Sequence, residues 1–185
     1  LAAGRRLGEA LGEEVAAAFL GGEMDAVSGE AIARGADKVC LVQDPLLAVP
    51  QIDLHLAAFE QLCAQTEPSV VLVGRTPLGA DIGPRLAFRM GVGMAQDCVE
   101  VGVDDETGRL VATRPVYGGS VVAKVTFPDT DPQVVVIRPK AYEPLEADPS
   151  RNGEVVAVQV YLDSSMAKTR LVKTVSHELE GVRLE

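Results

Sequence analysis

The sequence predicts a three-layer α/β domain with a mainly parallel sheet, followed by a β-rich second half. Up to residue 91, short apolar runs alternate with segments of helical periodicity, which is the order of βαβ units with right-handed crossovers. Beyond residue 91 the helical pattern is nearly lost, and turn sequences such as DDETG and PDTDP separate the apolar runs. This change predicts that part of the second half is antiparallel.

The expected helices of the first half end at glycines. Gly12, Gly35 and Gly91 each follow a segment of helical periodicity and are natural helix stops. Pro84 is expected in the first turn of the last helix, where a missing N–H costs little. The expected helices cover residues 1–11, 24–35, 52–65 and 81–90, and the expected strands cover residues 13–20, 37–44 and 69–74.

The second half is expected to contain strands joined by turns. The acidic run at residues 104–106 leads into Thr107 and Gly108 and is most simply a hairpin turn. Residues 139–152 are polar and rich in proline, which favours a long surface loop. The expected strands cover residues 98–104, 109–117, 120–127, 133–139, 154–163 and 169–178.

Composition indicates an ordinary water-exposed domain with an aliphatic core. The 185 residues are 47% hydrophobic but only 4% aromatic, and the net charge is −10. An acidic surface repels phosphate backbones and anionic lipids, so we expect neither nucleic-acid binding nor membrane insertion. No basic segment followed by an apolar run opens the sequence, and no apolar run reaches bilayer length, so we expect neither a secretory leader nor a membrane span. We expect a cytoplasmic protein or, in a eukaryote, one of the mitochondrial matrix.

Cysteines and histidines give no pattern of a metal or redox site. Cys40, Cys63 and Cys98 are far apart, and we interpret Cys40 and Cys63 as small buried hydrophobic residues. His55 and His177 lack cysteine or carboxylate neighbours at ligand spacing, so we expect no metal. We likewise expect no catalytic residues, because no nucleophile motif is present.

The loop at residues 74–81, GRTPLGAD, follows a strand and precedes a helix. Its candidate residues are Gly74, Arg75, Thr76, Gly79 and Asp81. In one interpretation its N–H groups cradle a phosphate and Arg75 supplies the counter-charge. In the other, Asp81 caps the helix and the loop is purely structural. The spacing matches neither a Walker A loop nor G-x-G-x-x-G, and we favour the structural interpretation.

The segment RPVYGGS at residues 114–120 joins two apolar strands. Its glycines predict positive φ or close approach of another backbone. One interpretation is an irregular turn, and the other is a loop that a partner approaches. We take Arg114, Tyr117, Gly118 and Gly119 as a candidate interface, since an aromatic side chain beside accessible backbone suits an interface centre.

Several segments together resemble the amino-terminal domain of the electron transfer flavoprotein alpha subunit. They are VLVGRTPLGADIGPRLAFRMGVGMAQDCVEV, TRPVYGGSVVAKV and PQVVVIRPKAYEP. The resemblance spans essentially the whole chain. The matching positions are Gly74, Thr76, Gly79, Asp81, Pro84, Arg85, Leu86, Ala87, Asp97, Cys98, Arg114, Pro115, Tyr117, Gly118, Gly119, Arg138 and Pro139.

This resemblance implies a fold like that of adenine nucleotide hydrolases, with the 74–81 loop as a vestigial nucleotide loop. It also implies that the full-length protein is an electron carrier, not an enzyme, working between flavin dehydrogenases and a quinone reductase or other acceptor. FAD would be bound by a C-terminal domain, and we expect no cofactor in this chain. This domain would scaffold a beta subunit and the FAD domain. The alternative is a nucleotide-binding module or small hydrolase that uses the 74–81 loop.

The chain departs from the family pattern at both ends. We interpret residues 1–185 as the amino-terminal domain, with about 176–185 as the start of a linker to a missing FAD domain. The strand that opens the family's domain is missing as well. We therefore expect a gap in the middle of the sheet, or a partner strand there.

Overall fold

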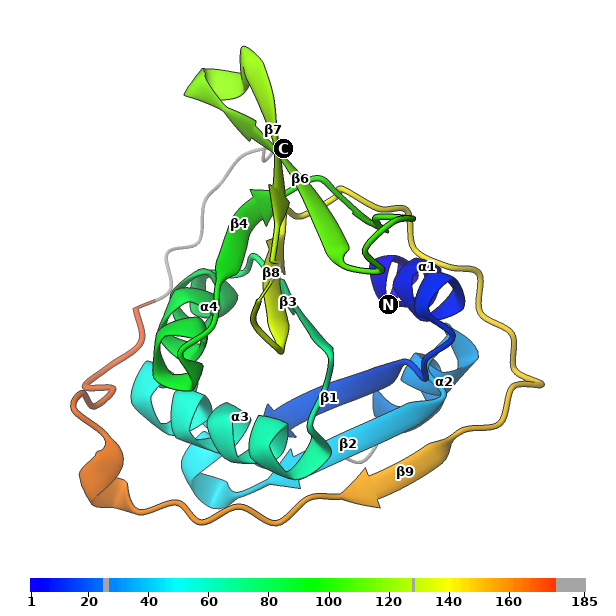
Figure 1. Cartoon of the computed structure of the whole chain (residues 1–185). Helices are drawn as coiled ribbons and strands as arrows, with labels where there is room; N and C mark the ends of the chain where they lie inside the picture. Colours follow the sequence, from blue (N-terminus) through cyan, green and yellow to red (C-terminus); the bar gives the residue numbers. More distant parts are fainter. Residues whose placement is uncertain (25–26, 128, 176–185) are drawn as a thin grey trace, which may run out of the picture.

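The computed structural model describes residues 1–24, 27–127 and 129–175 (Figure 1). The expected linker at 176–185 and His177 lie outside these residues. Helices and strands alternate through the first half: α1 (Ala2–Leu11), β1 (Ala16–Gly21), α2 (Val27–Ala33), β2 (Lys38–Gln43), α3 (Ile52–Thr66), β3 (Val70–Gly74) and α4 (Pro77–Met90).

The second half is almost entirely strands and loops. Its strands are β4 (Met94–Cys98), β5 (Glu100–Val103), β6 (Leu110–Val116), β7 (Val121–Thr126), β8 (Gln133–Ile137) and β9 (Glu154–Ala157). Short 3-10 turns occur at η1 (Pro45–Leu47), η2 (Tyr117–Gly119) and η3 (Ser164–Met166).

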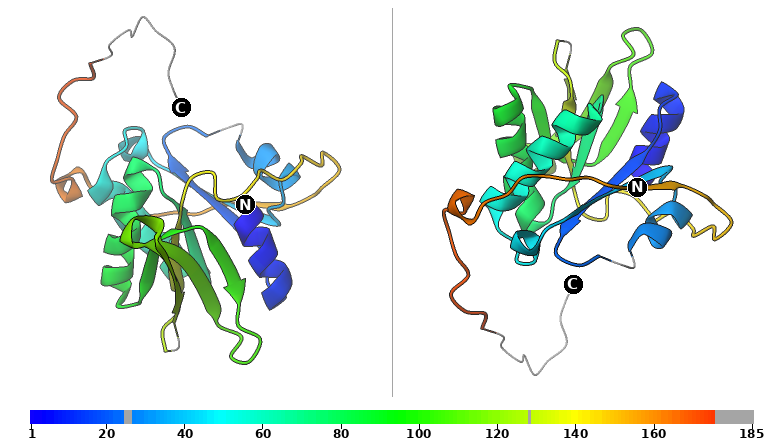
Figure 2. Two further views of the ribbon diagram at one scale, coloured as in Figure 1. Left: turned by 90° about the horizontal axis from the view of Figure 1, so that it is seen from above. Right: turned by 90° about the horizontal axis from the view of Figure 1, so that it is seen from below.

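The strands form two parallel sheets and one antiparallel sheet. The parallel sheets have the orders β1-β2-β9 and β3-β8-β4, and the antiparallel sheet has the order β5-β6-β7. Helices α3 and α4 pack together on one side, and α1 and α2 lie towards the other (Figures 1 and 2). The three-layer α/β fold is therefore confirmed.

The second half is partly antiparallel, as the sequence predicts. Only β5, β6 and β7 are antiparallel, whereas β8 inserts between β3 and β4, and β9 extends the sheet of β1 and β2. The three consecutive valines of β8, Val134, Val135 and Val136, have no exposed surface. An unbroken β-branched run of this kind is typical of a central parallel strand covered on both faces.

Several expected boundaries were wrong. Helix α4 begins at Pro77, four residues before the expected start, so Pro84 lies inside the helix and not in its first turn. Residues 94–97 belong to β4 although no strand was expected before residue 98. Residues 158–163 continue beyond β9 but do not belong to a strand, and residues 169–175 form no strand.

The buried side chains are mainly aliphatic and form separate clusters around the sheets. Cys40 and Cys63 lie among them, as the sequence predicts, and Cys98 is buried as well. Burial raises the pKa of Cys63 to about 11 and that of Cys98 to about 11. These thiols therefore stay protonated and unreactive at neutral pH.

Candidate functional site

Two glycines of α4, Gly79 and Gly83, allow the helix to lie close to the sheet. A Cβ atom on Gly79 would lie 2.0 Å from the carbonyl oxygen of Gly74, and one on Gly83 would lie 2.4 Å from Cγ2 of Val136. Neither position has room for a methyl group, because non-bonded carbon–oxygen and carbon–carbon contacts are not this short. These glycines are explained by helix–sheet packing without any ligand.

Most backbone amides of this loop already have acceptors within the protein. The Arg75 N–H donates to the Ile137 carbonyl at 2.9 Å, and the Thr76 N–H donates to the Gly74 carbonyl at 2.8 Å. The Thr76 hydroxyl caps α4 by accepting the Gly79 N–H at 3.0 Å. Pro77 has no N–H. The loop therefore presents no open row of amides for a phosphate.

Asp81 does not cap the helix, which corrects one interpretation drawn from the sequence. The N-cap is Thr76, and Asp81 is an exposed residue in the second turn of α4. Threonine is a favoured N-cap because its hydroxyl accepts an otherwise unpaired N–H.

Several arginines lie close to Asp97 at the carboxyl edge of the β3-β8-β4 sheet. It lies in a β-bulge of β4 with a positive φ of 65°. Its carboxylate accepts two hydrogen bonds from Arg138, at 2.9 and 2.6 Å, and lies 3.7 Å from Nε of Arg75. The hydrogen bonds from Arg138, together with the charges of Arg138, Arg75 and Arg114, lower the pKa of Asp97. The carboxyl edge of a parallel sheet is where α/β proteins commonly bind ligands.

Arg114 joins this cluster from β6. Its charge acts on Asp97 and opposes the burial-driven rise in the pKa of Cys98. Its Nε is buried and has no hydrogen-bond partner. A buried donor without an acceptor destabilises the protein by about 1–3 kcal/mol.

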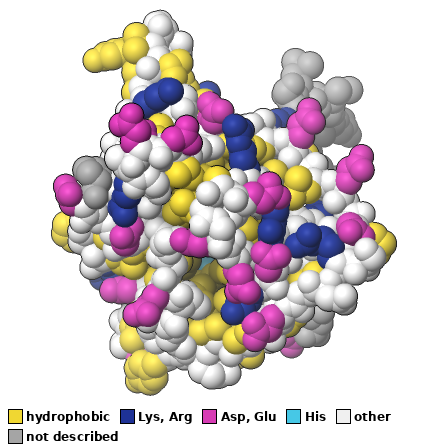
Figure 3. All heavy atoms as spheres, turned by 45° about the vertical axis from the view of Figure 1, so that its right-hand side comes forward, with side chains coloured by type: hydrophobic (Ala, Val, Ile, Leu, Met, Phe, Trp, Pro, Cys, Tyr) yellow, Lys and Arg dark blue, Asp and Glu magenta, His cyan; other side chains and the backbone are white. Residues whose placement is uncertain are grey.

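Strands β6 and β7 extend as a hairpin away from the body of the domain (Figures 1 and 3). We call residues 114–122 the arm. At its tip Tyr117, Gly118 and Gly119 have φ values of 51°, 66° and 94°. Tyr117 is 84% exposed, and Val121 and Val122 are 50% and 61% exposed. Apolar side chains clustered at one projecting tip form a surface suited to protein contact.

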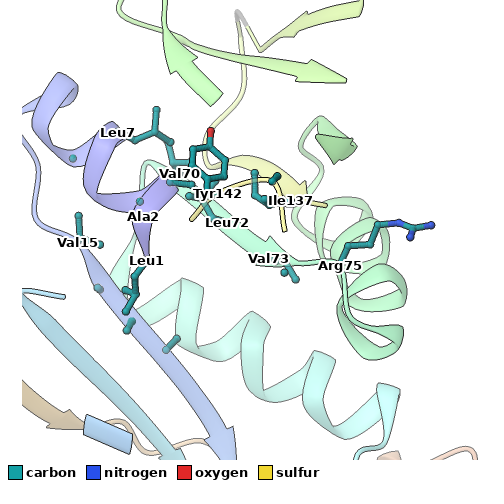
Figure 4. Close-up of a pocket in the computed structure, with 18 of the residues that line it drawn as sticks. Leu1, Ala2, Leu7, Val15, Val70, Leu72, Val73, Arg75, Ile137 and Tyr142 are labelled. Carbon is teal, nitrogen blue, oxygen red and sulfur yellow. The ribbon is translucent and has the colours of Figure 1, made fainter. Parts of the chain in front are cut away.

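A cleft of about 580 Å³ separates β1 from β3. Its walls come from α1, β1, β3 and residues 137–144. Leu1, Leu7, Leu72 and Ile137 line it, whereas Arg75 points away (Figure 4). The cleft is mainly apolar and lies where the sequence predicted a gap in the sheet.

The strands on either side of the cleft each pair on one edge only. Within the described residues, β1 pairs with β2 and β3 pairs with β8, and neither has a strand on the cleft side. Helix α1 is held beside the cleft through Asp37, which binds Arg5 and accepts the Val15 N–H at 3.0 Å. Burial raises the pKa of Asp37, but hydrogen bonds from Val15 and Arg5 outweigh it and leave the pKa lowered.

The two candidate sites, the 74–81 loop and the arm, meet at Asp97, which the sequence did not identify as a site residue. Arg75 comes from the 74–81 loop and Arg114 from the arm, and both act on Asp97. Neither Asp97 nor Arg138 was a candidate, because their proximity depends on β8 lying beside β4. Sequence spacing alone carries no signal of that strand order.

Residues 1–24, 27–127 and 129–175 contain no group of histidine, cysteine and carboxylate side chains able to hold a metal ion. No helix in this part of the chain has both the length and the apolar character needed to cross a membrane.

The chain is similar to known flavoprotein subunits. It is 35% identical over 181 residues to electron transfer flavoprotein subunit alpha of Megasphaera elsdenii, covering 98% of this chain and 54% of that protein. It is 32% identical over 179 residues to protein FixB of Azotobacter vinelandii, covering 95% and 48%. The chain thus spans about half the length of the curated relatives it matches.

Residues 1–163 also match the electron transfer flavoprotein domain family. This match covers the α/β body, the arm and the walls of the cleft. The chain therefore belongs to the electron transfer flavoprotein family, alongside the alpha subunits.

Proposed function

We propose that this chain is the scaffolding half of an electron carrier. The whole protein would accept electrons from flavin dehydrogenases and pass them to a quinone reductase or another acceptor. FAD would supply the redox chemistry from the other half of the protein, and this half would neither bind it nor catalyse a reaction. Family membership and the half-length match to alpha subunits support this proposal.

The arm is the proposed contact with the beta subunit. The observation that carries this proposal is the 84% exposure of Tyr117 at the tip of a projecting hairpin. A separate subunit has to be held by surface contacts alone, whereas a tethered FAD domain already has a high effective concentration. An aromatic anchor with apolar neighbours fits the first case better. Contact between the arm and the FAD domain is the alternative outcome.

The cleft between β1 and β3 is the proposed place of one further parallel strand. Such a strand would pair with both free edges and join the two parallel sheets into one. Because α1 begins beside the cleft and leads into β1, the polypeptide that leads into α1 would form a right-handed crossover from that position.

The nucleotide-binding module or small hydrolase is not favoured. Its loop amides are engaged internally, and the spaces at Gly79 and Gly83 are filled by the sheet. The 74–81 loop, including Gly74, Arg75, Thr76, Gly79 and Asp81, is therefore proposed as a vestigial nucleotide loop.

Association and flavin content test these proposals together. The chain is purified alone and with the beta subunit, and both are examined by size-exclusion chromatography, flavin absorbance and calorimetry with AMP, ADP and ATP. We expect a complex with the beta subunit, no stoichiometric FAD in the chain alone, and no micromolar nucleotide binding. Stoichiometric FAD in the chain alone would contradict the scaffolding role. Nucleotide binding that is lost in Arg75→Ala would restore the alternative.

A further inference from the structure

Two arginines at the base of the arm have donors without acceptors. Arg138 engages both oxygens of Asp97, so that pair is satisfied. Arg75 lies 3.7 Å from the same carboxylate, beyond hydrogen-bond distance, and its side chain is about half exposed. Arg114 is partly exposed, although its Nε is buried and has no partner. In the described part of the chain, neither Arg75 nor Arg114 donates a side-chain hydrogen bond.

The charge of this cluster is opposite to that of the chain. Three arginines face one aspartate here, although the whole protein carries a net charge of −10. Gathering guanidinium groups around one carboxylate is unfavourable unless a further anion accompanies them. The missing charge partner must therefore be sought outside the described residues.

We propose that Arg75 and Arg114 bind surface carboxylates of the beta subunit when it packs against the arm. This inference rests on the proposed function of the arm as the beta-subunit contact. It adds the chemistry of the partner, which must present acidic side chains beside an apolar area that receives Tyr117. Guanidinium groups bind carboxylates in a two-point geometry, and arginine beside tyrosine is a common combination at interface centres.

A protein carboxylate fits this cluster better than a free phosphate. A phosphate cradle needs backbone amides, and those of Arg75, Thr76 and Gly79 are already bonded within the loop. The cluster instead adjoins the exposed apolar side chains of the arm. An acidic partner surface can contact both areas at once, whereas a small anion contacts only the charges.

The test is the salt dependence of binding to the beta subunit. The dissociation constant is measured at 50 and 500 mM NaCl for the wild type, Arg75→Gln, Arg114→Gln and Tyr117→Ala. Arg89→Gln is the matched control, because Arg89 is a similarly exposed arginine that is already paired with Glu60 at 2.8 Å. We expect each of Arg75→Gln and Arg114→Gln to weaken binding about tenfold at low salt and far less at high salt, since salt screens exposed charges.

The outcomes separate this inference from the proposed function. If Tyr117→Ala weakens binding while Arg75→Gln and Arg114→Gln behave like Arg89→Gln, the arm is the interface but the charged contact is wrong. If none of the variants changes binding, both the arm as the beta-subunit contact and the charged contact are wrong. Inorganic phosphate is titrated in parallel by NMR, and saturable binding that is lost in Arg75→Gln would overturn the assignment to a protein carboxylate. Thermal unfolding of each variant confirms that it is folded.

Discussion

The start of α4 and the tip of the arm both contain glycines that sequence reasoning marked for function, yet the two regions use them differently. At Gly79 and Gly83 the backbone dihedrals are helical and the space beside the Cα atom is filled by the sheet. At Gly118 and Gly119 the space is empty and the backbone has positive φ. The first pair is required by packing, and the second by backbone conformation.

The two pairs of glycines therefore serve different roles: the α4 pair affects the stability of the fold, and the arm pair leaves a surface available for contact. A close approach within the core fixes how α4 lies on β3 and β8, so a change there alters the free energy of unfolding. A turn that leaves its side chains in solvent adds little to the core and remains available to a partner. A glycine-rich stretch in a sequence therefore does not indicate one role. Whether it serves packing or contact depends on which residues lie beside it in the folded protein.

The largest effect is expected for Gly79→Ala. The new methyl group would lie 2.0 Å from the Gly74 carbonyl oxygen, which belongs to backbone and cannot rotate away. We expect a loss of about 3 kcal/mol or more in the free energy of unfolding, measured by urea denaturation. Gly29→Ala in α2 is the control, because nothing lies within 4 Å of its Cβ position. It should be neutral or stabilise by up to about 1 kcal/mol. Equal effects of the two changes would contradict the packing explanation.

An intermediate effect is expected at Asp97, between the two regions. Asparagine tolerates the positive φ at this position, so Asp97→Asn removes the charge and little else. The pKa of Asp97 is lowered in the folded protein. Its charge therefore stabilises the fold above the unfolded pKa near 4, and this contribution is lost as the pH falls through the lowered pKa. We expect a difference of about 1 kcal/mol at pH 7 that shrinks below pH 4. Urea denaturation across this range measures it, and a difference independent of pH would refute the ion-pair explanation.

The smallest effect on stability is expected for Tyr117→Gly. Tyr117 has a φ of 51°, which glycine adopts more easily, and its side chain is 84% exposed. We expect the free energy of unfolding to rise by about 0.5 kcal/mol while beta-subunit binding weakens. Destabilisation with unchanged binding would show that Tyr117 is a structural residue and not a contact.

The sequence alone was sufficient for the α/β class and for most elements of the first half. Their signals are local, since helical periodicity, glycine stops and aliphatic runs depend on neighbouring residues. The start of α4 was misplaced because Asp81 looked like a cap, whereas Thr76, two residues after the end of β3, performs that role. Both residue types favour N-caps, and only the hydrogen bond from Gly79 distinguishes them.

Only the tertiary structure decided where β8 pairs and what surrounds Asp97. A strand with three consecutive valines is compatible with several positions in a sheet, and the place of β8 between β3 and β4 results from long-range burial. That placement brings Arg138 to Asp97, and the course of β6 brings Arg114 to the same carboxylate. The sequence determines which segments can become strands, because backbone and side-chain preferences are local. The order in which those strands pair, and hence the cluster at their ends, depends on the packing of the whole chain.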